Sequence, residues 1–407
     1  MTRNNYNNTM QTIALLIVLF GAAFSCQKHV VAEPENNEAT VRAKEETLTI
    51  DASMTLAQIN AVIASANAGE TVYADAGTYT ITGKIVMKAG VSLAKLTTTN
   101  PVFSAASLSS ILTLSYGTEL NNCTISGITF WNIRIVITSA ENVALKYCIF
   151  DYGKRAANTN KTNNLKDDYV ELLSTDSSLV TNCVFCHRAT DAGRGVWTKS
   201  TTNARILNNT FGNGGTTGYF VCAINDNSQS NSLISGNTLN RNTALNSIDS
   251  LTDHGMYCHS FTGLVITGNT VSGWPTNASG GSIKARNGSN LTISNNTLND
   301  AGIMLYEYVS NTAYPYLNNV MVSSNTINIA SPASDIYHGI GYYRDNTTHS
   351  EYSINITGNT LPNGTIMANS SNIDVTNFNA NGGGVYNNDV AAGYLLLKSG
   401  INNSGNY

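Results

Sequence analysis

A six-residue pattern recurs along much of the chain, in which apolar and small residues alternate and are followed by Asn, Thr and another apolar residue, as in 293–298 (ISNNTL). The clear copies are 206–211, 234–239, 266–271, 293–298, 322–327, 356–361 and 385–390. Segments 127–130, 147–150 and 182–185 continue the pattern upstream, and Cys148 and Cys183 stand where later copies have Asn. Copies follow one another at 20 to 35 residues. The alternation with a period of two predicts short strands in stacked repeats.

A repeat unit of this length is too short to enclose a hydrophobic core, so successive units must stack. Three short strands with their turns fill one coil of a parallel β-solenoid, whose coils advance by about 4.8 Å. We therefore expect the repeated Asn residues to form one interior file, each at a bend with left-handed backbone geometry and with its amide bonded to the coils above and below. Cys148 and Cys183 are expected to be buried, unpaired thiols in the same file.

Composition narrows the class of protein. The chain has 407 residues, of which 55 are Asn and only 12% are charged, against roughly 25% in typical soluble domains. The formal net charge of −4 argues against a protein that neutralises many nucleic-acid phosphates. Cys183 and Cys186 have Cys-x-x-Cys spacing, but the sequence has no second such pair, so a zinc or redox site is not favoured.

The N-terminus carries an export signal. The apolar run 13–23 is too short to cross a bilayer, and small residues lead from it to Cys26. This arrangement resembles a bacterial lipoprotein signal, which implies lipidation of Cys26; an ordinary signal cleaved nearby is the alternative. We expect residues 1–25 to be the signal peptide, 26–48 a flexible tether and 49–407 the β-helix domain. No later segment could be transmembrane.

The start of the solenoid also has a recognisable form. Leu56, Ile59, Val62 and Ile63 form one face of a short helix, and segments 69–73 (GETVY) and 76–79 (AGTY) follow it. With the repeats, this resembles the right-handed parallel β-helix proteins of the pectate-lyase superfamily, which cap the first coil with a helix. The nearest resemblance is to polysaccharide lyase family 6, which includes chondroitinase B and alginate lyases. It implies an all-β fold, a right-handed parallel β-helix of about ten or more coils.

Aligning each coil on its Asn position assigns the side chains of the preceding strand. The inward positions hold Val196, Met256, Ile283, Ile303 and Ile340, and two residues later Thr198, Cys258, Ala285, Leu305 and Tyr342. The first outward column is Glu171, Trp197, Tyr257, Lys284, Met304 and Gly341. The second outward column is Leu173, Lys199, His259, Arg286, Tyr306 and Tyr343. The coil that contains Cys222 and Asn225 has a looser register and is not assigned.

These columns concentrate charge and aromatic rings in a chain that is poor in charge. A groove of this kind suits an acidic polysaccharide, because Arg binds a uronate carboxylate in a bidentate manner and aromatic rings stack on sugars. Glu307 could orient Arg286 or act as a base. The inserts 154–168, 241–253, 309–318 and 344–351 are expected to wall the groove. The expected substrate-binding residues are Lys199, Trp197, Tyr257, Tyr343 and Glu307.

Cleavage of a uronate polymer by β-elimination needs a group that neutralises the carboxylate, a base for the C5 proton and an acid for the departing O4. Arg286 fits the first role. His259 or Lys284 fits the second, and Tyr306 or Tyr257 fits the third. The alternative is that these side chains only solvate the outside of the sheet.

The resemblance to family 6 implies a Lys base, an Arg one coil later, and a calcium ion held by acidic residues just before that Lys. Segment 281–288 (GSIKARNG) resembles the Arg-bearing strand, which implies this role for Arg286. The Lys position falls near His259, where the chain departs from the family pattern. Segment 251–254 (LTDH) lacks the usual carboxylates, so Ca²⁺ is implied by resemblance alone and no other cofactor is evident.

We therefore expect an exported, lipid-anchored protein of the cell surface or outer membrane that acts on an acidic polysaccharide by β-elimination. One alternative is a non-catalytic glycan-binding or adhesive solenoid, and another is a glycoside hydrolase or epimerase on the same scaffold. Hydrolysis needs two carboxylates across the groove, and the candidates are scattered: Glu171, Asp253, Glu307 and Asp345. The expected partners are the polysaccharide and, through the anchor only, a membrane. We expect a monomer that binds no nucleic acid.

Overall fold

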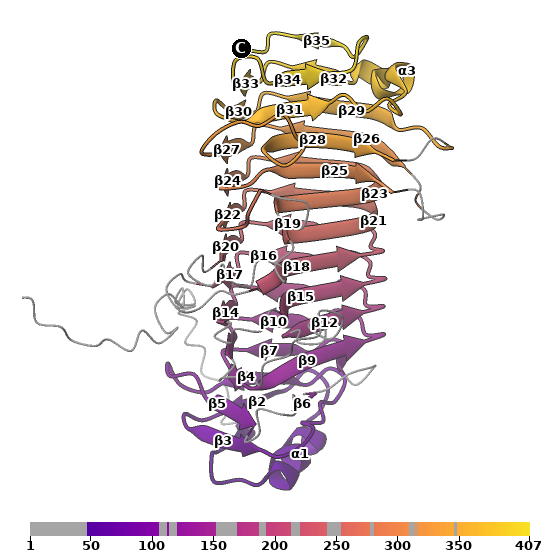
Figure 1. Ribbon diagram of the computed structural model, residues 1–407. Coiled ribbons are helices and arrows are strands. Elements are labelled where there is room, and N and C mark those ends of the chain that lie inside the picture. The colour runs from indigo at the N-terminus through magenta and orange to yellow at the C-terminus, as the bar shows by residue number, and fades with distance from the viewer. Residues whose placement is uncertain are drawn as a thin grey trace, which may run out of the picture.

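Short parallel strands stack coil upon coil along one axis, from α1 at one end to the C-terminus at the other (Figure 1). The computed structural model describes residues 47–105, 112–113, 120–151, 169–186, 193–212, 220–241, 254–276, 281–308, 314, 316–345 and 348–407. Every strand pair in this part of the chain is parallel, as coils of one solenoid require. The predicted all-β parallel β-helix is confirmed.

The strands form three rows, each contributing one strand per coil. The row named here the site face is β6 (Leu112–Thr113), β9 (Ile133–Thr138), β12 (Val170–Leu173), β15 (Gly193–Lys199), β18 (Phe220–Asn227), the first half of β21 (His254–Thr267) and of β23 (Gly281–Ser294), β25 (Ile303–Glu307), β28 (Gly339–Arg344), β31 (Thr365–Ala368) and β34 (Leu395–Leu397).

The second row joins the first through β21 and β23, which bend at Ser260 and Asn287, both with positive φ. It comprises β1 (Thr49–Ile50), β2 (Thr71–Ala74), β4 (Ser92–Lys95), β7 (Thr124–Ser126), β10 (Ala144–Lys146), β13 (Leu179–Thr181), β16 (Arg205–Leu207), β19 (Leu233–Ser235), β26 (Leu317–Ser323), β29 (Tyr352–Thr357), β32 (Gly384–Tyr386) and β35 (Asn403–Ser404). The third row is a separate 12-stranded sheet. It comprises β3 (Thr78–Ile81), β5 (Val102–Ala105), β8 (Thr129–Trp131), β11 (Ile149–Asp151), β14 (Val184–Cys186), β17 (Thr210–Phe211), β20 (Thr238–Asn240), β22 (Thr270–Ser272), β24 (Thr297–Asn299), β27 (Thr326–Asn328), β30 (Thr360–Leu361) and β33 (Asp389–Val390).

A helix closes the N-terminal end of the core, as predicted. Helix α1 (Leu56–Ser65) begins at a capping box, in which Thr55 accepts from the Gln58 backbone and Gln58 accepts from the Thr55 backbone. Its buried residues Ile59 and Ile63 cover the first coil. Two short helical segments, α3 (Val375–Phe378) and η3 (Ala380–Gly382), lie beside the last coils (Figure 1).

The Asn residues form the interior file that the repeats predict. In this ladder each buried amide donates to the side-chain oxygen of the Asn in the next coil at 2.8–3.0 Å and also to a backbone carbonyl. Its members are Asn209, Asn237, Asn269, Asn296, Asn325, Asn359 and Asn388. One detail of the prediction was wrong: the left-handed residue is the one before each ladder Asn, for example Asn295 before Asn296. The residue before each ladder Asn makes the bend, and the side chain of the ladder Asn forms hydrogen bonds with the backbone around it.

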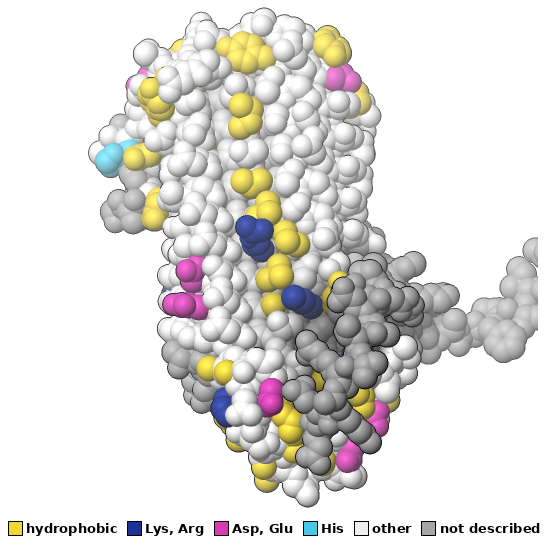
Figure 2. Space-filling view, turned by 180° about the vertical axis from the view of Figure 1, so that it is seen from behind, with side chains coloured by type: hydrophobic (Ala, Val, Ile, Leu, Met, Phe, Trp, Pro, Cys, Tyr) yellow, Lys and Arg dark blue, Asp and Glu magenta, His cyan; other side chains and the backbone are white. Residues whose placement is uncertain are grey.

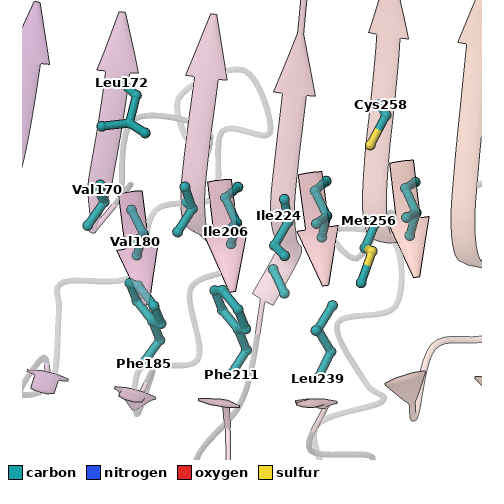
Figure 3. Packing of buried hydrophobic residues seen from close by; sticks show 14 of the residues in the cluster. Val170, Leu172, Val180, Phe185, Ile206, Phe211, Ile224, Leu239, Met256 and Cys258 are labelled. Carbon is teal, nitrogen blue, oxygen red and sulfur yellow. The ribbon is translucent and has the colours of Figure 1, made fainter. Parts of the chain in front are cut away.

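The core fills the inside of the coils. Figure 3 shows side chains from all three rows pointing to one interior, with Met256 and Cys258 on the same side of β21. In the third row Phe185 stacks on Phe150 and Phe211, with ring centroids 4.9 and 4.5 Å apart. Cys148 and Cys183 are free and buried, as predicted.

The face of the molecule seen from behind carries few charges (Figure 2). Seen from behind, the molecule shows a vertical band of hydrophobic side chains with occasional Lys or Arg, and most of the remaining surface is uncharged (Figure 2). Within the described ranges, no helix is long and apolar enough to cross a bilayer. The expected signal peptide 1–25, most of the tether 26–48 and Cys26 lie outside the described residues.

Candidate functional site

The outward side chains of the site face line up in the two columns that the sequence predicts. Strand pairing places Tyr257 beside Lys284 and His259 beside Arg286, and then Arg286 beside Tyr306. The unassigned coil is β18, which contributes Asn225 to the first column and Asn227 to the second. Lys199 is therefore separated from His259 by one coil, and consecutive members of a column lie about 4.8 Å apart along the axis.

Two cations and three tyrosine rings form the centre of this face. The Lys284 ammonium lies 5.5 Å from the Tyr257 ring centroid and 5.2 Å from that of Tyr306. The Arg286 guanidinium carbon lies 5.5 Å from the Tyr257 ring centroid and 5.1 Å from that of Tyr308. Both cations are partly buried, and such cation–π contacts stabilise a charge without neutralising it.

Arg286 has no carboxylate partner among the residues that the structure describes. Its Nε is buried and makes no hydrogen bond there. A guanidinium held between two rings and lacking a counter-charge is prepared to bind an anion, and its planar fork matches a carboxylate. Arg286 is thus placed where the sequence predicts it, with its binding capacity unused.

His259 is neutral over the ordinary pH range. Burial and the neighbouring Arg286 charge lower its pKa to about 4. Its Nδ1 lies 3.2 Å from the Ser260 hydroxyl, and its ring centroid is 5.2 Å from that of Tyr257. The imidazole therefore offers a lone pair and not a charge.

Three tyrosines form an aromatic platform on the C-terminal side of Arg286. The Tyr306 and Tyr343 ring centroids are 5.1 Å apart with 13° between the planes, and those of Tyr306 and Tyr308 are 6.1 Å apart with 29° between them. The Tyr306 hydroxyl donates to the Asp345 carboxylate at 3.3 Å. Burial and then the Asp345 charge raise the pKa of Tyr306 to about 12, so it remains protonated. Tyr308 and Tyr343 are each 37% exposed.

The N-terminal part of the face is a second basic and aromatic region. The Arg194 guanidinium carbon lies 3.9 Å from the Trp197 ring centroid. Glu171 is buried and accepts from Arg134 at 2.7 Å. Lys199 is exposed three coils from Arg286. The structure therefore places Trp197 and Lys199 on the same face as the central cations but not in contact with them.

Glu307 does not lie where the sequence analysis expected it. It is fully buried, because it alternates with the outward Tyr306. Its carboxylate accepts from the Leu317 backbone and the Tyr342 hydroxyl, and it lies 3.5 Å from the Arg344 Nε. Burial raises the pKa of Glu307 to about 8. It supports the interior beneath the platform and does not reach the outer surface or Arg286.

The carboxylates available for a metal or for hydrolysis are few. No group of three His, Cys, Asp or Glu side chains in the described part of the chain could hold a metal ion. Glu171 and Glu307 are buried, and both face Arg side chains. Asp253 and most of the inserts 154–168 and 241–253 lie outside the described residues. The described site therefore provides no ligand set for Ca²⁺.

The structure adds residues that the sequence analysis did not assign to the site. Asn225 and Asn227 complete the columns, and Tyr308 extends the aromatic surface beside Arg286. A sequence signal existed for Tyr308, since it follows Tyr306 by two residues and so shares its face. The register of β18 could not be recognised from the sequence, because Asp226 occupies an inward position that is apolar or weakly polar in the other coils.

The similarity of this chain to known proteins lies in its fold. The sequence matches no protein-family model and no curated protein. Among solved structures it is similar to the surface adhesin PfbA of Streptococcus pneumoniae, at 13% identity and a TM-score of 0.52 over 86% of this chain and 88% of that chain. It is also similar to a polygalacturonase from Erwinia carotovora ssp. carotovora, at 13% identity and a TM-score of 0.51 over 90% of this chain and 99% of that chain. These similarities show the fold alone, which is a right-handed parallel β-helix.

Proposed function

We propose that the site face binds an acidic polysaccharide and cleaves it next to a uronate by β-elimination. The observation that carries this proposal is the pair Lys284 and Arg286, which project together between tyrosine rings, with Arg286 lacking a carboxylate partner in the described structure. A uronate carboxylate supplies the missing counter-charge, and the rings offer uncharged aromatic surface to the neighbouring sugars of the polysaccharide.

The order of groups along the second column matches the chemistry. His259, Arg286 and Tyr306 occupy successive coils. Arg286 and Lys284 neutralise the carboxylate, which acidifies the C5 proton, and the neutral His259 imidazole accepts that proton. The electron pair forms the C4–C5 double bond as the C4–O4 bond breaks, and the protonated Tyr306 hydroxyl donates its proton to O4. The two states of protonation follow from the lowered pKa of His259 and the raised pKa of Tyr306.

Binding without cleavage is the second candidate function. A base works best when its pKa lies near the working pH, and a His259 pKa of about 4 makes this imidazole a weak base. The same cations and rings would then hold a glycan without reacting with it.

Export and lipid anchoring are part of the proposal. They rest on the apolar run 13–23 and on the small residues before Cys26. If the proposal is correct, Cys26→Ser releases the protein from the membrane fraction of the producing cell. An unchanged membrane fraction would contradict lipid anchoring.

Incubation with alginate, chondroitin, pectin and heparin tests the activity, with the ultraviolet absorbance of the unsaturated uronate as readout. We expect one polymer to give this absorbance, and Arg286→Ala to lower the rate by about 100-fold or more. Arg205→Ala, which removes an exposed Arg from the second row, is the matched control and should have no effect. Binding without absorbance supports the second candidate. New reducing ends without absorbance indicate hydrolysis, and the absence of both binding and turnover contradicts the proposal.

A further inference from the structure

Charge is distributed unevenly along the site face. From β18 to β28 the two outward columns carry cations in one coil only, at Lys284 and Arg286. The coil before it presents Tyr257 and the neutral His259. The two coils after it carry no charge at these positions, which hold the buried Met304 and Gly341 and the tyrosines Tyr306 and Tyr343. A homopolymer of uronates lying along this face would place carboxylates opposite both kinds of surface.

The aromatic platform is unsuited to a carboxylate. Its rings stack on one another, and Tyr308 and Tyr343 are each 37% exposed, so uncharged aromatic surface is open to a ligand. Removing an ion from water against such a surface costs free energy unless a counter-charge is present. The C–H face of an uncharged sugar ring buries apolar area on the same surface at no such cost.

Asp345 adds a negative charge at this platform. Its carboxylate accepts from the Tyr306 hydroxyl at 3.3 Å, and its backbone N–H donates to Glu307 at 3.2 Å, so its position is fixed from two sides. A uronate bound over Tyr306 would face a like charge, which is unfavourable. Hydroxyl groups of a neutral sugar can instead donate to this carboxylate.

One coil advances by about 4.8 Å, which is comparable to the advance of a polysaccharide chain by one sugar. The platform begins one coil after Arg286, because Arg286 pairs with Tyr306. We infer that Tyr306, Tyr308, Tyr343 and Asp345 form a binding subsite for an uncharged sugar directly next to the uronate held by Lys284 and Arg286. The ligand is then a mixed polysaccharide that joins uronates to neutral sugars, and not a homopolymer of uronates. This inference rests on the proposed function.

Matched oligosaccharides test the inference. Oligogalacturonate supplies only uronates, and a hyaluronan oligosaccharide of equal length alternates a uronate with an uncharged N-acetyl sugar. Calorimetry gives the affinity of the full-length protein for each, or kcat/KM is compared where a ligand is turned over. We expect the mixed ligand to be preferred by about 10-fold or more, the size of one like-charge contact at partial screening.

Two variants locate the preference. Asp345→Asn removes the like charge, so it should shift the ratio of oligogalacturonate affinity to hyaluronan affinity by about 3- to 10-fold in favour of oligogalacturonate. Tyr343→Ala should weaken the affinity for the hyaluronan oligosaccharide by about 3- to 10-fold. The controls Asp75→Asn, directly after β2, and Tyr352→Ala, in β29, lie outside the site face and should change neither the affinity ratio nor the hyaluronan affinity.

The outcomes separate the two proposals. Equal or better recognition of oligogalacturonate, with no effect of Asp345→Asn, overturns the inference and leaves the proposed function standing. Failure of the wild-type protein to bind either of these ligands or any polymer of the activity panel overturns the proposed function itself, and the inference with it.

Discussion

At the scale of single residues, the ladder Asn shows why this sequence tolerates so many buried amides. Asn296 is 1% exposed, yet all of its polar groups are satisfied. Its Nδ2 donates to Asn325 and to the Ile266 carbonyl, and its Oδ1 accepts from the backbone and side chain of Asn269. A buried polar group costs little when every donor and acceptor has a partner, and costs its full desolvation when one is lost.

The first prediction follows from this ladder. Asn296→Leu keeps the branching at Cγ, adds some volume, and leaves two Asn269 donors and the Ile266 carbonyl without partners. We expect the free energy of unfolding to fall by about 2–4 kcal/mol, measured by urea unfolding. The control is Asn328→Leu, at an exposed position of β27, which should change it by less than about 0.5 kcal/mol. Equal effects of the two variants would contradict the ladder as a source of stability.

The second prediction concerns His259. Burial and Arg286 lower its pKa to about 4, so the folded imidazole takes up its proton later than the unfolded one as the pH falls. The free energy of unfolding therefore decreases progressively as the pH falls below about 6.5, the ordinary pKa of His. NMR titration of the imidazole should show this low value, and Arg286→Gln should raise it, while Arg205→Gln should not. A wild-type pKa near 6.5 would contradict the placement of His259.

At the scale of elements, strand β18 is the coil that departs from the common pattern. Asp226 points inward between Thr198 and Cys258 and is 1% exposed. Its Oδ1 accepts from the Thr198 hydroxyl. Burial raises the pKa of Asp226 to about 7, which means that the folded protein holds a proton that the unfolded chain releases near pH 4. Strand β18 thus links the stability of the solenoid to pH.

The third prediction tests this link. Because the folded-state pKa of Asp226 is raised, its contribution to stability is present below about pH 4 and is lost as the pH rises through about 7. Asp226→Asn removes this titration, so the melting temperature of the variant should rise relative to the wild type as the pH increases from about 4 to about 7, and the difference should stay level above that. Asp300→Asn, at an exposed position, is the control. Parallel pH profiles for wild type and Asp226→Asn would contradict this assignment.

The same elements show how far sequence reasoning reached. Periodicity predicted the fold, the ladder and the register of the strands that carry Lys284 and Arg286, because each coil repeats one local pattern. It did not assign β18, since a buried carboxylic acid looks like an exposed one in the sequence. It also misplaced Glu307, whose partners Tyr342 and Arg344 come from the next coil. Contacts between coils are long-range, and the pattern within one coil does not contain them.

At the scale of the whole molecule, strand pairing in the described part of the chain joins each coil to the coils next to it. Interactions therefore propagate along the axis by nearest neighbours, and the stability of a solenoid is close to a sum of local terms. The site face draws its central residues from β21 to β28, whereas the phenylalanine stack of the third row ends at β17, in the coil of β16. Damage to the stack and damage to the site should therefore be separable.

The fourth prediction uses this separation. Phe185→Ala removes a ring that stacks on both Phe150 and Phe211 and leaves a cavity in the core. We expect the free energy of unfolding of this region to fall by about 3–5 kcal/mol. Hydrogen exchange should then show lost protection in β11, β14 and β17, with protection retained in β28 to β32 and glycan affinity changed by less than about two-fold. In a nearest-neighbour stack the defect is confined to the coils that touch it. Uniform loss of protection along the chain would contradict this model and would mean that the solenoid unfolds as one unit.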